Sequence, residues 1–281
     1  MIAEQTPLEL QKEKIIEEIS ISSSKDNKIP VRYSTKSNTE IRINVKAGTT
    51  VTLLEQSEIG KVHDVNVYLD IYENAHVTLV RFVTSPTQIT TQTKIFRNAT
   101  LTTITLLLSS ATVERTTCLH DEGAAVEEYD CVLLAGKETL KLSTKITNEA
   151  ASTKAHSLLR GVACQESSVE CKGLMKIEKN ARQASSWLGQ HIFLLSNQAR
   201  ARSLPFLEIE NNDVQAYHAA SVSPVDDEQI TYLRSRGVTL DESKTLLAQG
   251  YVEPVILKIV NEDILRDARE LLRSRWQYAL S

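Results

Sequence analysis

Short segments in the first two thirds of the chain alternate apolar and polar residues with a period of two. The stretch IRINVKAG places Ile41, Ile43 and Val45 on one face, and VNVYLDIY repeats the pattern from Val65 to Ile71. Such alternation predicts half-buried β-strands, because successive side chains of a strand point to opposite faces. The stretches TLTTITLLL and ETLKLSTKI are rich in β-branched residues, which also favours strands.

A repeated motif precedes many of these strands. The segments KAGTTVTL, YENAHVTL, FRNATLTT, DEGAAVEE and TNEAASTK each place a turn residue and then a small residue before a new strand. The small or β-branched anchors are 24 to 26 residues apart: Thr49, Ala75, Ala99, Ala124 and Ala150. Looser copies follow in EKNARQAS, SNQARARS and ENNDVQAY. This period, with almost no helix between the strands, predicts a β-helix. The alternative is a β-sandwich with Asn-Ala turns.

Both ends of the chain have helical patterns. Near the N-terminus, TPLE fits a capping box with Pro7 at the first helical position, and Leu10, Ile15, Ile16 and Ile19 would share one face. A β-helix exposes apolar residues and strand edges at its ends, so we expect helices to cover them. We predict an N-terminal helical segment at 1–27, a β-helix core at 28–223 and a C-terminal helical domain at 224–281.

The predicted C-terminal helices carry their own start and stop signals. PVDDEQITYLRSRG begins with acidic residues, has Arg234 and Arg236 in its last turn and stops at Gly237. This order suits the helix dipole and a glycine cap. Thr239 to Glu242 form a second capping box, and the final stretch repeats apolar residues at helical spacing.

Composition limits the class of protein. Hydrophobic residues make up 41% of the chain and aromatic residues only 5%, so the core must be mainly aliphatic. The net charge of −4 and the lack of clustered Lys and Arg argue against nucleic-acid binding. No apolar run approaches the roughly 18 residues of a membrane span. The N-terminus is too charged for a signal peptide, so we expect a cytoplasmic protein.

The residues favour a binding or scaffold role over an enzyme. The four cysteines, Cys118, Cys131, Cys164 and Cys171, form no C-x-x-C pair and fit inert thiols in strands. Phosphate-loop, dinucleotide-binding, zinc-protease and nucleophile-elbow motifs are absent from the sequence. A β-helical carbohydrate-active enzyme is the alternative from another class, and it would need a carboxylate cluster in one groove.

One of the six histidines has a distinctive position. His218 lies in the last predicted strand before the helical domain, where a partner would meet the end of the β-helix. Neutral imidazole is a common metal ligand. From the residues alone, His218 is either a structural histidine or a metal ligand.

Five blocks follow one another in the second half of the chain: LLAGKETLKLSTKI, SLLRGV, GLMKIEKNARQASS, LLSNQARARSLPFLEIENNDVQAYHAASVSPVDDEQITYLRSRG and LLAQGYVEPVI. In this order they resemble the SufB/SufD family of iron–sulfur cluster assembly scaffolds. The resemblance is close over about half of the chain, whereas the first third shares only the strand-rich character.

The resemblance implies a right-handed parallel β-helix followed by a helical C-terminal domain. It also implies that two such subunits pair through their β-helices, and that the C-terminal helices of each hold a copy of SufC, an ABC-type ATPase. An iron–sulfur cluster would then form transiently at the interface between the subunits.

Within the family, the chain is most similar to the SufD type. The SufB type has an essential cysteine six residues before the proline of its P-x-x-E strand, and this chain has Ala199 before Pro205. The SufB type has a glutamate after the interface histidine, where this chain has Ala219. His218 matches the SufD interface histidine, a proposed cluster ligand. The cysteine that often stands two residues earlier is replaced by Ala216.

These matches predict a scaffold subunit that pairs with a SufB-like subunit. A homodimeric minimal scaffold, made of two copies of this chain with a SufC-like ATPase, is the alternative. We expect the ATPase to contact the segment 239–256 through Leu246, Leu247 and Tyr251. Arg234 and Arg236 either cap their helix or contact the ATPase.

Overall fold

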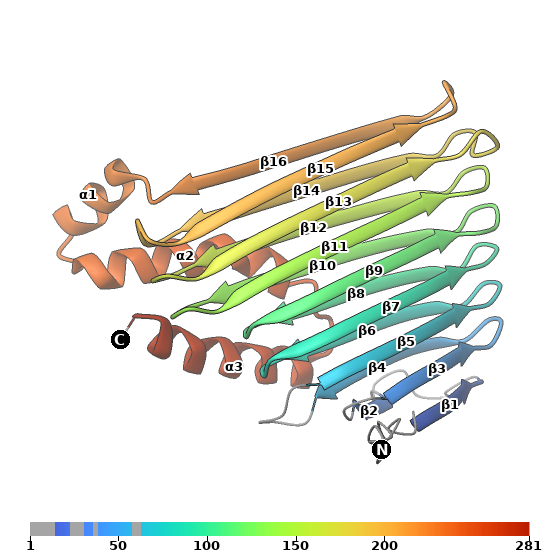
Figure 1. The fold of residues 1–281 in the computed structure, drawn as a ribbon, viewed down its shortest axis with the longest axis horizontal. Helices are drawn as coiled ribbons and strands as arrows, with labels where there is room; N and C mark the ends of the chain where they lie inside the picture. Colours follow the sequence, from blue (N-terminus) through green and yellow to red (C-terminus); the bar gives the residue numbers. More distant parts are fainter. Residues whose placement is uncertain (1–14, 23–30, 36–38, 58–62, 281) are drawn as a thin grey trace, which may run out of the picture.

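Sixteen strands form two parallel sheets in the computed structural model, which describes residues 15–22, 31–35, 39–57 and 63–280. The chain alternates between the sheets, so that each coil contributes one strand to each (Figure 1). The odd-numbered sheet contains β1 (Ile15–Ile21), β3 (Thr39–Val45), β5 (His63–Ile71), β7 (Thr87–Ile95), β9 (Ala111–Leu119), β11 (Thr139–Asn148), β13 (Ser168–Ile177) and β15 (Arg200–Ile209). The even-numbered sheet contains β2 (Val31–Thr35), β4 (Thr50–Ser57), β6 (His76–Val83), β8 (Thr100–Leu107), β10 (Ala125–Leu134), β12 (Lys154–Ala163), β14 (Ser185–Leu194) and β16 (Gln215–Pro224). The predicted parallel β-solenoid is confirmed, and its right-handed sense stays a prediction.

The turn before each even-numbered strand from β4 to β14 explains the sequence repeat. The residue directly before each anchor has a positive φ: Gly48, Asn74, Asn98, Gly123, Ser152 and Gln183. Glycine and asparagine tolerate this left-handed conformation best, which is why they recur there. The next residue turns inward and is buried, as Ala75 and Ala99 are. Only a small side chain fits where the chain enters the core.

The fifth anchor is Thr153, and the prediction of Ala150 is wrong. Lys154 pairs with Ala125, which places the fully buried Thr153 in register with Ala124. The turn before β12 is longer, and its left-handed residue is Ser152. The Thr153 hydroxyl donates to the Ala150 carbonyl at 2.9 Å, so Ala150 closes the turn. The segment SNQARARS, which was grouped with this repeat, leads into β15. It is therefore a turn before an odd-numbered strand and not a copy of the turns before the even-numbered strands.

The predicted N-terminal helix is wrong from Ile15 onward, because Ile15–Ile21 is strand β1. It pairs in parallel with β3, with Ile19 opposite Ile43 and Ile21 opposite Val45. The open edge of β3 offers backbone partners, and isoleucine favours a strand over a helix in such a place. Residues 1–14, which include the predicted capping box, lie outside the described part of the chain.

Three helices follow β16 in the described residues: α1 (Asp227–Ser235), α2 (Leu240–Ile256) and α3 (Glu262–Leu280). Asp226 caps α1, Gly237 follows it with a φ of +87°, and Thr239 with Glu242 forms the predicted capping box of α2. None of the helices in the described part of the chain is long and apolar enough to cross a membrane.

The helices cover the side of the solenoid and leave its last coil open. Helices α2 and α3 pack on the outer face of the even-numbered sheet (Figure 1). Leu106 and Leu133 of that sheet share one buried cluster with Val255, Ile264 and Trp276 of the helices. This differs from the expectation that helices would cap the end, because the sheet's outer face is itself apolar and competes for the helices.

Candidate functional site at the open end of the solenoid

The last coil, made of β15 and β16, is the exposed end of the stack. Its strands have neighbours on one side only, β13 and β14, and most of their residues are accessible to solvent. Large apolar side chains remain uncovered there: Ile209 is 47% exposed, Val222 41% and Tyr217 63%. Unpaired backbone groups at a strand edge, together with apolar side chains, favour association with another chain.

His218 lies in β16, at an inward-facing position of this coil. It pairs in register with Leu188, which is almost fully buried between the two sheets. Side chains alternate along a strand, so Ala216 and Ala220 share the face of His218. In an inner coil this position would be covered by the next strand. At the open end His218 is exposed instead.

The facing strand β15 completes the inner side of the last coil. Ser203, Pro205 and Leu207 pair with Cys171, Gly173 and Met175 of β13, so they face inward as well. The Ser203 hydroxyl donates to the Gln190 side-chain oxygen at 2.7 Å, across the gap between the sheets. The inner side of the last coil therefore presents small or apolar residues, and His218 is the single imidazole among them.

The positions of the two SufB markers are also well defined. Ala199 is buried in the turn before β15, and Ala219 pairs with Gly189 on the outer face of the even-numbered sheet. Neither side chain can bind a metal.

The described residues contain no group of three or more histidine, cysteine, aspartate or glutamate side chains arranged to ligate a metal ion. Cys131, Cys164 and Cys171 are buried, and burial raises the pKa of each thiol, that of Cys164 to about 12. The pKa of Cys118 is raised to about 11 by partial burial and by Glu149. Protonated thiols are poor metal ligands.

The residues predicted to contact a partner separate into two kinds. Leu246 is 51% exposed and lines an open hollow of about 500 Å³ between α1 and α2, together with Arg236 and Val238. Leu247 and Tyr251 instead pack against the apolar cluster beneath α2. Of the three residues, only Leu246 is classed as exposed, so it is the best placed of them to meet another protein.

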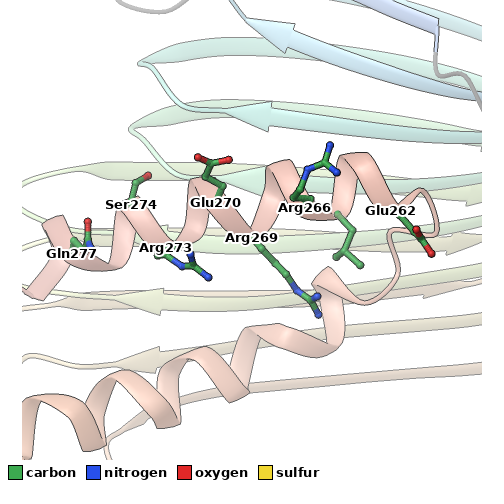
Figure 2. Close-up of a pocket in the computed structure, with 8 residues that line it drawn as sticks. Glu262, Arg266, Arg269, Glu270, Arg273, Ser274 and Gln277 are labelled. Carbon is green, nitrogen blue, oxygen red and sulfur yellow. The ribbon is translucent and has the colours of Figure 1, made fainter.

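Sequence reasoning missed a basic groove along α3. Figure 2 shows Arg266, Arg269 and Arg273 projecting from this helix, beside a hollow of about 800 Å³. Arg266 forms an ion pair with Asp263, and Arg269 forms one with Glu253 of α2, each at 2.8 Å. These pairs neutralise much of the positive charge, and one helix supplies the whole lining. The groove has no grouping of residues suited to catalysis.

One pair of carboxylates lies inside the solenoid, around a buried arginine. Glu128 and Asp130 both contact the Arg115 guanidinium, at 3.0 Å each, and all three side chains are buried. A glycosidase needs its pair of carboxylates in an open cleft where a sugar can reach them. This buried pair therefore cannot serve the carbohydrate-active alternative.

Fold and site together define a parallel β-solenoid with an open terminal coil that carries one exposed histidine, and with helices along its side. Residues 30–251 match the family model for the SUF system FeS cluster assembly, SufBD core domain. The chain therefore belongs to the SufBD family, and the resemblance seen in the sequence is confirmed.

Individual relatives support a SufD-like assignment. The chain is 32% identical over 151 residues to the iron–sulfur cluster assembly protein SufD of Bacillus subtilis, which covers 54% of this chain and 35% of that protein. It is 23% identical over 218 residues to a SufBD family protein of Staphylococcus saprophyticus, covering 75% of this chain and 46% of the relative. A SufBD family protein of Mycobacterium tuberculosis is 30% identical over 118 residues, covering 42% of this chain and 14% of that protein. The chain spans less than half the length of each of these relatives.

Proposed function

We propose that this chain is a SufD-like, non-enzymatic scaffold subunit for iron–sulfur cluster assembly. Its last coil would pair with a SufB-like subunit, and its helices would hold a SufC-like ABC ATPase. The observation that carries the proposal is His218, exposed at an inward-facing position of the edge strand β16. Family membership supports the same role.

The edge strands supply the means of pairing. Strands β15 and β16 offer backbone donors and acceptors along the end of both sheets, and a partner strand can extend either sheet. Ile209 and Val222 add apolar area at the same place. A partner docked there would bring its own side chains next to His218, where a cluster would be assembled as the product of the complex.

A cysteine-bearing partner suits this site better than a second copy of the chain. Iron–sulfur clusters are held mainly by thiolates, with histidine as an occasional ligand. Ala199, just before the last coil, stands where the SufB type has a cysteine, and Ala216 stands where the SufD type often has one. The thiol of Cys171 is buried one coil further in. Two copies would therefore meet with two imidazoles and no exposed thiolate in the last coil.

The proposed ATPase contact is centred on Leu246. This residue and the hollow between α1 and α2 form an outward surface, in which Arg236 also takes part. Arg236 lies 5.3 Å over the ring of Tyr232, so it is held on this surface. Leu247 and Tyr251 support α2 from beneath.

The test is anaerobic co-expression of the chain with SufB-like and SufC-like partners, followed by native mass and iron measurement. His218→Ala should lower the iron per complex and the visible absorbance while the complex stays intact. His76→Ala removes another exposed histidine, one far from the last coil, and should change neither. Unchanged iron in the His218→Ala complex would overturn the ligand role. A homodimer that binds iron without a SufB-like partner would favour the minimal-scaffold alternative.

The ATPase contact is tested in the same preparation. Leu246→Glu should abolish co-purification of the ATPase and leave pairing with the SufB-like subunit intact. Leu257→Glu, at a 57% exposed position after α2, serves as the matched control. If Leu257→Glu releases the ATPase and Leu246→Glu does not, the assignment to the hollow between α1 and α2 is wrong.

A further inference from the structure

A side-chain hydrogen bond crosses from one sheet to the other at the base of the last coil. The Ser203 hydroxyl in β15 donates to the side-chain oxygen of Gln190 in β14 at 2.7 Å. Gln190 is only 2% exposed, and its partners in the strand register, Leu159 and Ala220, are apolar. Burying an amide costs free energy unless it is hydrogen-bonded, so the bond to Ser203 helps to hold this side chain in the core.

Gly173 of β13 leaves room for this crossing. A Cβ atom at Gly173 would lie 2.9 Å from the side-chain nitrogen of Gln190 and 2.7 Å from Cδ2 of Leu188. A glycine inside a strand commonly marks a place where another group approaches closely. Any larger residue at this position would push the side chains of Gln190 and Leu188 aside.

Leu188 and Gln190 form the floor of the last coil. Leu188 pairs in register with His218, and Gln190 pairs with Ala220, so both support the inward face of β16. Through Ser203, Gln190 also holds the facing strand β15. The same strand, β14, therefore carries the residue beneath the candidate ligand and the residue that ties the opposite sheet to it.

The edge strands of the last coil need such a tie. Among the described elements, β15 has a strand neighbour only in β13, and β16 has one only in β14. The described strands form two separate sheets, and no strand pairing joins one sheet to the other. At the open end, the spacing between β15 and β16 therefore depends on side-chain contacts, and few contacts leave such a segment less restrained.

We propose that Gln190 is a positioning residue, which ties β15 to β14 through Ser203 and thereby sets the spacing between β15 and His218. The inference rests on the proposed function for its meaning, because this spacing matters to cluster assembly only if His218 binds the cluster. A partner docked on the last coil would meet both edge strands. Their spacing then decides whether the imidazole reaches the metal.

The first experiment uses the chain alone and measures amide hydrogen exchange and the NMR signal of the His218 ring, which is identified by its loss in His218→Ala. Gln190→Leu replaces the amide by an apolar side chain and removes the acceptor of Ser203. Loss of this hydrogen bond should make the paired amides of β15 exchange roughly 2- to 10-fold faster and should shift the His218 signal. Ser203→Ala should give the same changes, and the double variant should add nothing further. Ser203→Thr, which keeps a hydroxyl, should behave like the original chain.

Ser186→Ala is the matched control, because it removes a buried cross-sheet hydrogen bond from the same strand. The Ser186 hydroxyl donates to the side-chain oxygen of Asn148 in β11 at 2.8 Å, and this bond involves neither strand of the last coil. The control should change neither the exchange of β15 nor the His218 signal. Exchange of β15 in Gln190→Leu that stays within error of the original chain, or equal acceleration in Ser186→Ala, would overturn the proposal.

The second experiment uses the complex with its partners. Gln190→Leu should lower the iron per complex while the mass of the protein assembly stays the same, and Ser186→Ala should leave the iron unchanged. If His218→Ala lowers the iron and Gln190→Leu does not, the positioning role is wrong. If His218→Ala has no effect, the proposed function fails, while the exchange result still decides whether Gln190 restrains β15.

Discussion

The buried ion cluster inside the solenoid offers the sharpest test of the structure. Arg115 contacts Glu128 and Asp130 at 3.0 Å each, and its side chain is 3% exposed. Glu128 also accepts a hydrogen bond from Thr117 at 3.1 Å. Two carboxylates thus share one guanidinium between the sheets, where the surrounding residues exclude water.

Arg115→Met should be severely destabilising. Breaking a buried ion pair by removal of one partner costs about 3–5 kcal/mol, and here two carboxylates lose their partner, so we expect about 5 kcal/mol. At roughly 2–4 °C per kcal/mol, the melting temperature should fall by about 10 °C or more. Urea denaturation, monitored by circular dichroism, measures the loss in free energy of unfolding. A thermal scan measures the fall in melting temperature.

Glu128→Gln is the matched variant, and it should be nearly neutral. Burial raises the pKa of Glu128, and Arg115 offsets this only in part. The glutamine side chain retains an acceptor for Thr117 and leaves Arg115 paired one to one with Asp130. The two variants should therefore differ by several kcal/mol, although each removes one charge.

The sign of the pH dependence follows from the same shift. Because the folded-state pKa of Glu128 lies above its unfolded value, its contribution to stability is complete below the unfolded pKa of about 4.3. That contribution is lost as pH rises through the folded pKa. The free energy of unfolding of the original chain, minus that of Glu128→Gln, should fall as the pH rises above the unfolded pKa of about 4.3. A difference that is independent of pH, or a loss in Glu128→Gln equal to that in Arg115→Met, would refute the reasoning.

Two further predictions concern the turns and the thiols. Gly123→Ala should destabilise the chain by about 1–3 kcal/mol in the same denaturation assay, because φ is +73° and a Cβ would lie 2.3 Å from the Asn98 side chain; a melting curve like that of the original chain would contradict this. A thiol reagent at pH 8 should modify Cys118 before Cys131 or Cys171, since burial raises the pKa of each thiol but only Cys118 is partly exposed. Equal labelling rates, read by mass spectrometry, would show that the solenoid opens around its core.

Periodicity carried much of the fold prediction. The alternation in IRINVKAG and VNVYLDIY identifies β3 and β5, and turn residues before small anchors identify the coil. Local signals also located the helix caps, as Thr239 and Glu242 show. These features depend on neighbours within a few residues, so they can be read from the chain directly.

The errors arose where distant parts of the chain compete. The isoleucines from Ile15 to Ile21 fit either a helical face or a strand, and the free edge of β3 decides for the strand. Ala150 was predicted to be the buried small residue before β12. The strand register shows that Thr153, level with Ala124, occupies that position. Tyr251 was predicted to face a partner, yet Phe193 and Arg160, each more than fifty residues away, hold it against the sheet.

The sequence by itself determined that the chain is a coil of parallel strands with helices after it, that it belongs with the SufB/SufD scaffolds, and that His218 is the residue to examine. Short-range alternation and left-handed turn positions encode those features. Only the tertiary structure decided that the helices cover the side of the solenoid and that the last coil stays open. These outcomes depend on which apolar faces bury each other, and that choice is made between residues far apart in the chain.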